Sequence, residues 1–140
     1  MPTKVIDAFL KNQRVGHLAT VDEQGRPVVV PLCFAYNGKA FYSSVDEKPK
    51  SVSPQALKRI RNIQANPEVA LVLDHYEEDW GRLRFALIRG RARMLFSGKE
   101  HARALALLRK KYPQYRAMRL EHRPVIKIVP WKIQHWTSQQ

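Results

Sequence analysis

Residues 15–36, VGHLATVDEQGRPVVVPLCFAY, decide the fold of this chain. Two runs rich in β-branched and aromatic residues, Val15–Val21 and Pro27–Tyr36, flank the polar segment Asp22–Gly25. Such residues favour strands, and Gly25 can adopt the positive φ that a hairpin bulge requires. The pattern therefore predicts a β-hairpin.

A second turn signal follows the hairpin. The pair Asn37-Gly38 favours a type I′ turn, and it leads into an apolar run at residues 40–45. We therefore expect the runs 15–21, 27–36 and 40–45 to form one three-stranded antiparallel meander.

Three segments have the signals of helices. Residues 3–12 place apolar side chains at helical spacing. A basic helix is expected to begin at Ser53-Pro54, an N-cap followed by a first-turn proline, and to end at Asn66-Pro67. Residues 97–100, SGKE, match a capping box and predict a third helix through about residue 111. Its expected inward face is Ala102, Leu105, Ala106 and Leu108.

The remaining apolar runs predict strands at residues 68–75, 82–96 and 124–136. In the second of these, Leu83, Phe85 and Leu87 share one face, but the parity slips near residues 86–88, where a β-bulge would keep one face inward. Together the elements predict a mainly β fold, a six-stranded antiparallel barrel with peripheral helices, in a single domain over residues 1–140.

The composition restricts the class of protein and its ligands. The 140 residues include one cysteine, which excludes an intramolecular disulfide framework. No apolar run approaches the roughly 20 residues that span a bilayer, and the N-terminus lacks a secretory signal, so we expect a cytoplasmic protein without membrane partners. The net charge of +13 attracts anions: phosphates, polyanionic cofactors and nucleic acid are all candidates.

The segment 41–51, FYSSVDEKPKS, precedes the basic helix and concentrates groups that bind anions. Hydroxyls at a strand end, then lysines, then a capped helix N-terminus would bring donors and positive charge to one region. A solvated basic loop and helix face would have the same composition. Both interpretations remain open from the residues alone.

No residue of this chain has a pattern that requires catalysis or metal binding. The segment 74–80, DHYEEDW, mixes carboxylates with a histidine, but lacks any recognised ligand spacing. We interpret it as a surface loop whose Trp80 packs against the barrel, another subunit or a ring. The other histidines are scattered without a nucleophile or helical H-x-x-x-H spacing.

Three stretches taken in order resemble one known family. They are HLATVDEQGRPVVVP at 17–31, the SS to K-x-K stretch at 43–50, and LKRIRNIQANPEVAL at 57–71. They look like the pyridoxamine 5′-phosphate oxidase-like proteins, which have the FMN-binding split β-barrel fold, and the resemblance covers nearly the whole chain. Residues 74–80 and 112–115 are similar to stretches of the branch of oxidoreductases that depend on the deazaflavin coenzyme F420.

The resemblance implies a homodimer with each cofactor, FMN or F420, at the subunit interface. The family's phosphate-binding residues match Ser43, Ser44, Lys48, Lys50 and Ser51, with Arg61 and Asn62 as further candidates. The family's ring lies against strand backbone, which corresponds to Val29, Val30 and Pro31. Our candidates for covering the ring from the partner subunit are Trp80 and Trp131.

The resemblance also implies an oxidoreductase that transfers a hydride to a small-molecule substrate, because the cofactor supplies this chemistry. A non-catalytic cofactor carrier is the first alternative. A nucleic-acid-binding domain is the second, although the chain lacks a recognition helix, a zinc module and interleaved exposed aromatics. The net charge of +13 would suit the carboxylate-rich tail of F420 as well as a single phosphate, so the choice between FMN and F420 stays open.

Overall fold

The computed structural model describes residues 4–45 and 54–139, with side chains described for 4–45 and 58–139. The elements in chain order are α1 (Lys4–Asn12), β1 (Gly16–Val21), β2 (Pro27–Leu32), β3 (Ala35–Tyr36), β4 (Phe41–Ser44), α2 (Pro54–Ala65), β5 (Glu68–His75), the 3-10 helix η1 (Trp80–Arg82), β6 (Arg84–Leu95), α3 (Lys99–Lys111), the 3-10 helix η2 (Pro113–Ala117) and β7 (Val125–Thr137). The expected N-cap Ser53 lies outside the described residues. None of the described helices is both long and apolar enough to cross a bilayer.

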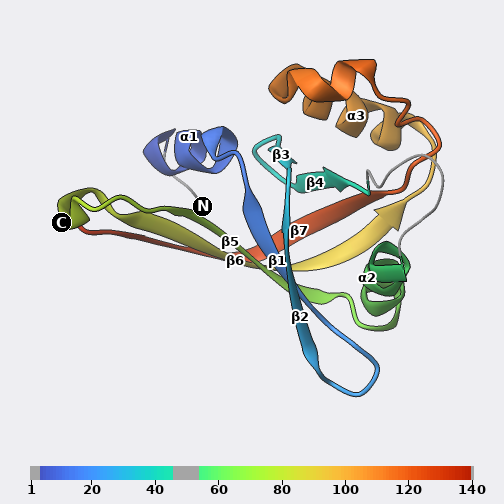
Figure 1. Cartoon of the computed structure of the whole chain (residues 1–140), viewed down its shortest axis with the longest axis horizontal. Helices are drawn as coiled ribbons and strands as arrows, with labels where there is room; N and C mark the ends of the chain where they lie inside the picture. The colour runs from blue at the N-terminus through green and yellow to red at the C-terminus, as the bar shows by residue number, and fades with distance from the viewer. Residues whose placement is uncertain (1–3, 46–53, 140) are drawn as a thin grey trace.

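The described strands form one antiparallel sheet in the order β2-β1-β5-β6-β7-β4-β3. The sheet curls into a half-barrel with α2 beside β1 and β6, and with α3 beside β3 and β4 (Figure 1). The prediction of a mainly β antiparallel split barrel with peripheral helices is confirmed. The sheet has seven strands rather than six, because the run 27–36 divides into β2 and β3.

The predicted three-stranded meander is wrong. Strands β2 and β3 follow each other in the sequence but lie at opposite edges of the sheet. Strand β2 pairs with β1, from Pro27 opposite Val21 to Leu32 opposite Gly16, whereas β3 pairs with β4 and with no other strand of the described sheet. The chain leaves one edge at Cys33 and Phe34 and joins the other edge at Ala35.

Two side chains at the end of α3 hold the backbone of Phe34 where it leaves the sheet. The Lys111 ammonium donates to the carbonyl oxygen of Phe34 at 2.9 Å and to that of Gln13 at 2.7 Å. The Tyr112 hydroxyl accepts the N–H of Phe34 at 3.1 Å and lies 2.8 Å from the carbonyl oxygen of Arg14. Buried backbone groups need such partners, so these contacts permit the bend that no local signal indicates.

Of the two turns predicted in the first 40 residues, one is confirmed and the other is wrong. Gly25 has a φ of 79°, as the hairpin bulge required. The type I′ turn is wrong, because no described residue other than glycine has a positive φ, and that turn needs one at Asn37. The Asn37 side chain instead accepts the N–H groups of Lys39 and Ala40, each at 2.8 Å, in a loop of residues 37–40.

At the start of β6, around residues 85–87, the inward face is the opposite of the predicted one, whereas Arg89, Arg91 and Arg93 point outward. Ala86 and Ile88 are fully buried, whereas Phe85 is 39% exposed. The bulge lies later than expected, between Arg89 and Gly90, where β7 contains the extra residue Trp131. Three of the buried residues, Ala86, Gly90 and Ala92, are small, so the more hydrophobic side chains at the start of the strand indicate the wrong face.

The capping box at the start of α3 does not form. Gly98 occupies the N-cap position without a side-chain cap. Glu100 instead accepts hydrogen bonds from Lys127 at 2.6 Å and Tyr42 at 2.7 Å, and these bonds lower the pKa of its carboxyl group. The buried face of the helix is His101, Ala104, Leu105 and Leu108, so the expectation for Ala102 and Ala106 is wrong.

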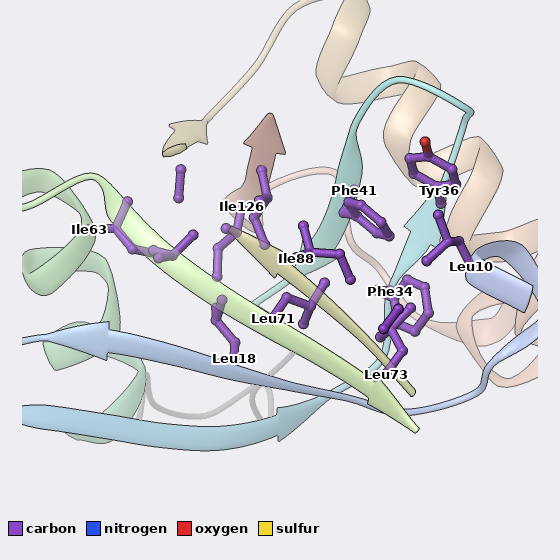
Figure 2. Close-up of a cluster of buried hydrophobic side chains, with 14 of the residues drawn as sticks. Leu10, Leu18, Phe34, Tyr36, Phe41, Ile63, Leu71, Leu73, Ile88 and Ile126 are labelled. Atoms are coloured by element: carbon purple, nitrogen blue, oxygen red, sulfur yellow. The ribbon is translucent and has the colours of Figure 1, made fainter. Parts of the chain in front are cut away.

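Two apolar clusters occupy the two faces of the curled sheet. The larger one fills the concave side, where β-strand side chains meet Leu10 from α1 and Ile63 from α2 (Figure 2). The smaller one lies between α3 and the β3–β4–β7 end of the sheet, around Tyr42 and Leu108. Side chains from α1 and α2 therefore pack in one cluster, and those from α3 pack in the other.

The burial of Lys111 predicts a pH dependence of stability. Burial, with a smaller contribution from Arg14, lowers the pKa of Lys111 to about 8, whereas a lysine in the unfolded chain keeps its proton to about pH 10.5. Between about pH 8 and 10 the unfolded state thus binds more protons, so this group makes stability rise with pH. Urea unfolding at pH 7.5 and 9.5 should show that rise diminished in Lys111→Met.

The matched control is Lys110→Met, because Lys110 is exposed and adjacent. It should keep the wild-type difference between the two pH values. Equal pH dependence in wild type and Lys111→Met would contradict the assignment of this titration to Lys111.

Candidate functional site

A cavity of about 380 Å³ lies between the edge strand β2 and helix α2. This volume falls in the range of roughly 300–1,000 Å³ that is typical of small-molecule sites. The lining residues come from β1, β2 and α2: Thr20, Val28, Val29, Val30, Lys58, Arg59 and Asn62. One wall is therefore apolar strand, and the other is basic helix.

The strand wall follows from the hairpin. The register places Thr20 of β1 opposite Val28 of β2. Val29 is 62% exposed, although it is a large apolar residue in a strand. Because β2 is an edge strand, no further strand of the described sheet covers this valine-rich segment. Apolar side chains line most small-molecule pockets, so this segment suits the apolar part of a ligand.

The helix wall follows from the spacing of α2. Residues three and four apart share a helix face, so Lys58 and Arg59 lie on the same side as Asn62. Arg61 is exposed and does not line the cavity. The family resemblance indicates Arg61 rather than Arg59. The sequence could have predicted Arg59, because it lies three positions before Asn62 and residues three apart share a helix face.

The polar groups of the cavity are incompletely paired. The Arg59 Nε is buried and has no hydrogen-bond partner among the described residues. The buried Asn62 donates to the Thr20 hydroxyl only at the long distance of 3.4 Å. An unpaired buried donor on a cation is costly, and an oxyanion would satisfy it. These residues therefore fit a ligand that combines a ring with a phosphate or carboxylate.

The two serines predicted to hold the phosphate lie on β4, away from the β2 edge of the sheet order. The Ser43 hydroxyl donates to the carbonyl oxygen of Cys33 at 2.7 Å, so it is engaged by backbone. The Ser44 hydroxyl is buried without a partner in the described part of the chain. Neither serine lines the β2–α2 cavity.

Three further predicted phosphate ligands, Lys48, Lys50 and Ser51, lie outside the described residues. Of the ring-contacting candidates, Val29 and Val30 line the cavity, whereas Pro31 is exposed just beyond it. The structure therefore brings together Val29, Val30 and Asn62 from the predicted set.

Both predicted covering tryptophans are exposed and lie outside the cavity of their own chain. Trp80 in η1 is 66% exposed, and its indole N–H donates to the Tyr76 hydroxyl at 3.3 Å. Trp131 at the β7 bulge is 57% exposed, and its indole N–H donates to Glu68 at 3.1 Å. Each indole is oriented by a hydrogen bond while its ring remains largely uncovered.

The curled antiparallel sheet with its peripheral helices defines a split barrel, and the cavity between the edge strand β2 and the basic helix α2 is its candidate ligand site. The family model for pyridoxamine 5′-phosphate oxidase matches residues 2–137. This chain therefore belongs to the pyridoxamine 5′-phosphate oxidase family. No curated protein matches its sequence.

Solved structures with the same fold have diverse descriptions. The conserved hypothetical protein Rv2991 from Mycobacterium tuberculosis has a TM-score of 0.79 and 20% identity, with 99% of this chain and 86% of that chain covered. A FAD-binding protein from Mesorhizobium loti has a TM-score of 0.70 and 23% identity, with 96% and 94% covered. HutZ, the heme storage protein from Vibrio cholerae, has a TM-score of 0.71 and 19% identity, with 98% and 95% covered. At these identities the likeness concerns the fold.

The unpaired Arg59 predicts a gain of stability on its removal. Arg59→Met keeps the apolar stem of the side chain and deletes a buried donor, so the free energy of unfolding should rise by about 0.5–1.5 kcal/mol. Arg61→Met, on the exposed side of the same helix, should change it by less than about 0.5 kcal/mol. Urea unfolding of both variants checks this. Destabilisation by Arg59→Met alone would indicate that Arg59 has a structural role.

Proposed function

We propose that this protein binds a flavin or deazaflavin, FMN or coenzyme F420, in the β2–α2 cavity and uses it in an oxidoreductase reaction on a small molecule. The observation that supports this most directly is the buried, unpaired Arg59 Nε beside the valine wall of β2. Family membership supports the same class of ligand. A bound cofactor of this class supplies the hydride transfer.

The residues of the cavity would have distinct roles. The side chains and backbone of Val28 to Val30 would support one face of the ring. Arg59 and Lys58 would hold the anionic part by charge-assisted hydrogen bonds, which are stronger than neutral ones. Asn62 would direct its amide to a polar edge. No side chain among the lining residues is a carboxylate or histidine, so the role of this chain would be to bind and orient.

Fluorescence titration with FMN and with F420 tests the ligand. We expect one of them to bind at micromolar concentration or tighter, with little loss between 50 and 200 mM salt, because apolar and ring contacts are hardly screened. Binding to duplex DNA should instead weaken steeply with salt, by a slope of about −0.9 for each phosphate contact. If neither cofactor binds while DNA binding survives 200 mM salt, the cofactor proposal is wrong.

Single substitutions test whether the cofactor binds in the β2–α2 cavity. Arg59→Met should weaken cofactor binding by about tenfold, the loss expected for one charge-assisted hydrogen bond. Arg103→Met, an exposed position on α3, is the control and should bind within about twofold of wild type. A larger loss in Arg61→Met than in Arg59→Met would move the anion site to the outer face of α2.

A homodimer with the cofactor at its interface is part of this proposal. On the outer face of β6 and β7, Phe85 is stacked on Trp136 with ring centroids 5.7 Å apart, and both rings are substantially exposed. Trp131 and Val129 add apolar surface on β7. Exposed apolar surface of this kind is typical of protein interfaces, and a second copy could bring Trp80 or Trp131 to the open side of the cavity.

Light scattering at micromolar concentration should therefore give twice the chain mass of 16.3 kDa. Trp131→Ala should shift the equilibrium toward monomer and weaken cofactor binding together, since one surface would serve both. A monomeric mass with cofactor still bound would contradict the dimer.

A further inference from the structure

A second cavity, of about 630 Å³, is lined by residues of α1, η1 and the strands next to them. In Figure 1, α1 and α2 lie at different sides of the sheet, α1 on the left and α2 on the right. The lining of the cavity comes from the end of α1, from the β5–η1–β6 connection and from the end of β7, and includes Phe9, His75, Arg82 and Arg84. It shares no lining residue with the β2–α2 cavity. Its chemistry is therefore independent of the cofactor proposal.

Contacts with two neighbouring side chains hold the guanidinium of Arg84 in place at this cavity. Its guanidinium carbon lies 4.0 Å above the centroid of the Phe9 ring. Its Nε and Nη2 atoms lie 3.3 and 3.0 Å from a single atom, the Nε2 of His135. The His135 ring in turn meets Phe9 edge-on, with centroids 5.7 Å apart. The arginine is thus held in one orientation by an aromatic face and an imidazole.

The charge of Arg84 is not compensated. Because arginine always donates, His135 must accept at Nε2, which makes it a neutral ring with its proton on Nδ1. Burial, and then the charge of Arg84 itself, lower the pKa of His135 and keep it neutral. Within the described residues no carboxylate forms an ion pair with Arg84, and its Nη1 has no hydrogen-bond partner.

The other basic side chains that line the cavity are paired with a carboxylate. Arg82 pairs with Glu77 at 3.5 Å, and His75 is bonded to the same carboxylate. The Asp79 carboxylate accepts the N–H of Gly81 at 3.1 Å as the cap of η1. Among the groups that the structure describes, Arg84 is therefore the one cation lining this cavity that forms no ion pair with a carboxylate.

An adjoining hollow indicates what kind of anion would fit. It has a volume of about 480 Å³ and also borders Arg84, Phe9 and Gln13. Its remaining wall is α1, where Val5 and Ala8 lie beside Lys4 and Asn12. Val5 is 68% exposed. A guanidinium fork suits a planar carboxylate, and the helix wall suits an apolar body attached to it.

We propose that Arg84, seated on Phe9 and His135, is the anchor of a second ligand site that binds small organic carboxylates with an apolar body. The carboxylate pairs with the free edge of the guanidinium, and the apolar body lies along α1. A pre-oriented arginine loses little side-chain entropy on binding, which favours even a small ligand.

Benzoate is the probe, with benzamide as its neutral isostere and inorganic phosphate as an anion that lacks the apolar body. Two-dimensional 1H–15N NMR of the full chain should show benzoate shifting the Gln13 side-chain amide and the Gly81 backbone amide, both of which line the cavity. Benzamide and phosphate should bind at least about tenfold more weakly, the loss expected when one charge-assisted or apolar contribution is removed. Equal binding of benzoate and benzamide would overturn the proposal without any variant.

Arg84→Gln should weaken benzoate binding by about tenfold, and Arg84→Lys should weaken it by a smaller factor because the charge remains without the fork. Arg89→Gln is the matched control on the same strand, since Arg89 is exposed and outside the cavity, and it should bind within about twofold of wild type. Unchanged benzoate binding in both Arg84 variants would also overturn the proposal. Cofactor titration of Arg84→Lys should match wild type, which separates this site from the β2–α2 cavity.

Discussion

The bend at Phe34, held by Lys111 and Tyr112, is the constraint on which the rest of the structure depends. The contacts join residues 77 and 78 positions apart in the sequence. They allow the chain to leave β1 and β2 at one edge and to start β3 at the other, so the sheet curls instead of extending flat. They also leave β2 as an edge strand, and its uncovered valines become one wall of the cavity against α2.

Most of the elements with a local sequence signal were predictable. The bounds of β5 agree with the predicted run 68–75, the Gly25 hairpin forms as expected, and the helices begin and end near their predicted positions. Apart from the Asn37-Gly38 turn, whose failure is local, the failures at Glu100 and Phe34 involve partners distant in sequence. Glu100 is engaged by Tyr42 and Lys127 instead of capping its own helix, and the backbone of Phe34 is satisfied by Tyr112. A pattern of neighbouring residues does not show these distant hydrogen-bond partners.

The site was predictable in part, for a similar reason. Of the residues that the resemblance indicated, Val29, Val30 and Asn62 line one cavity, because a strand run and a helix position are local features. It did not single out Arg59, since the choice between Arg59 and Arg61 depends on which face of α2 packs on the sheet. Ser43 was indicated by its type, yet its hydroxyl is engaged by Cys33, a partner that appears only when the chain bends.

The edge position of β2 also bears on how this protein behaves at high concentration. In a strand, the N–H groups of residues two apart point the same way, and a ladder tolerates proline only where the N–H would point away from its partner. Pro27, Val29 and Pro31 therefore share the outer side of β2, where Val29 has the sole donor within this strand. An edge with so few donors is a poor template for another chain, so the strand can stay open to a ligand without promoting edge-to-edge aggregation.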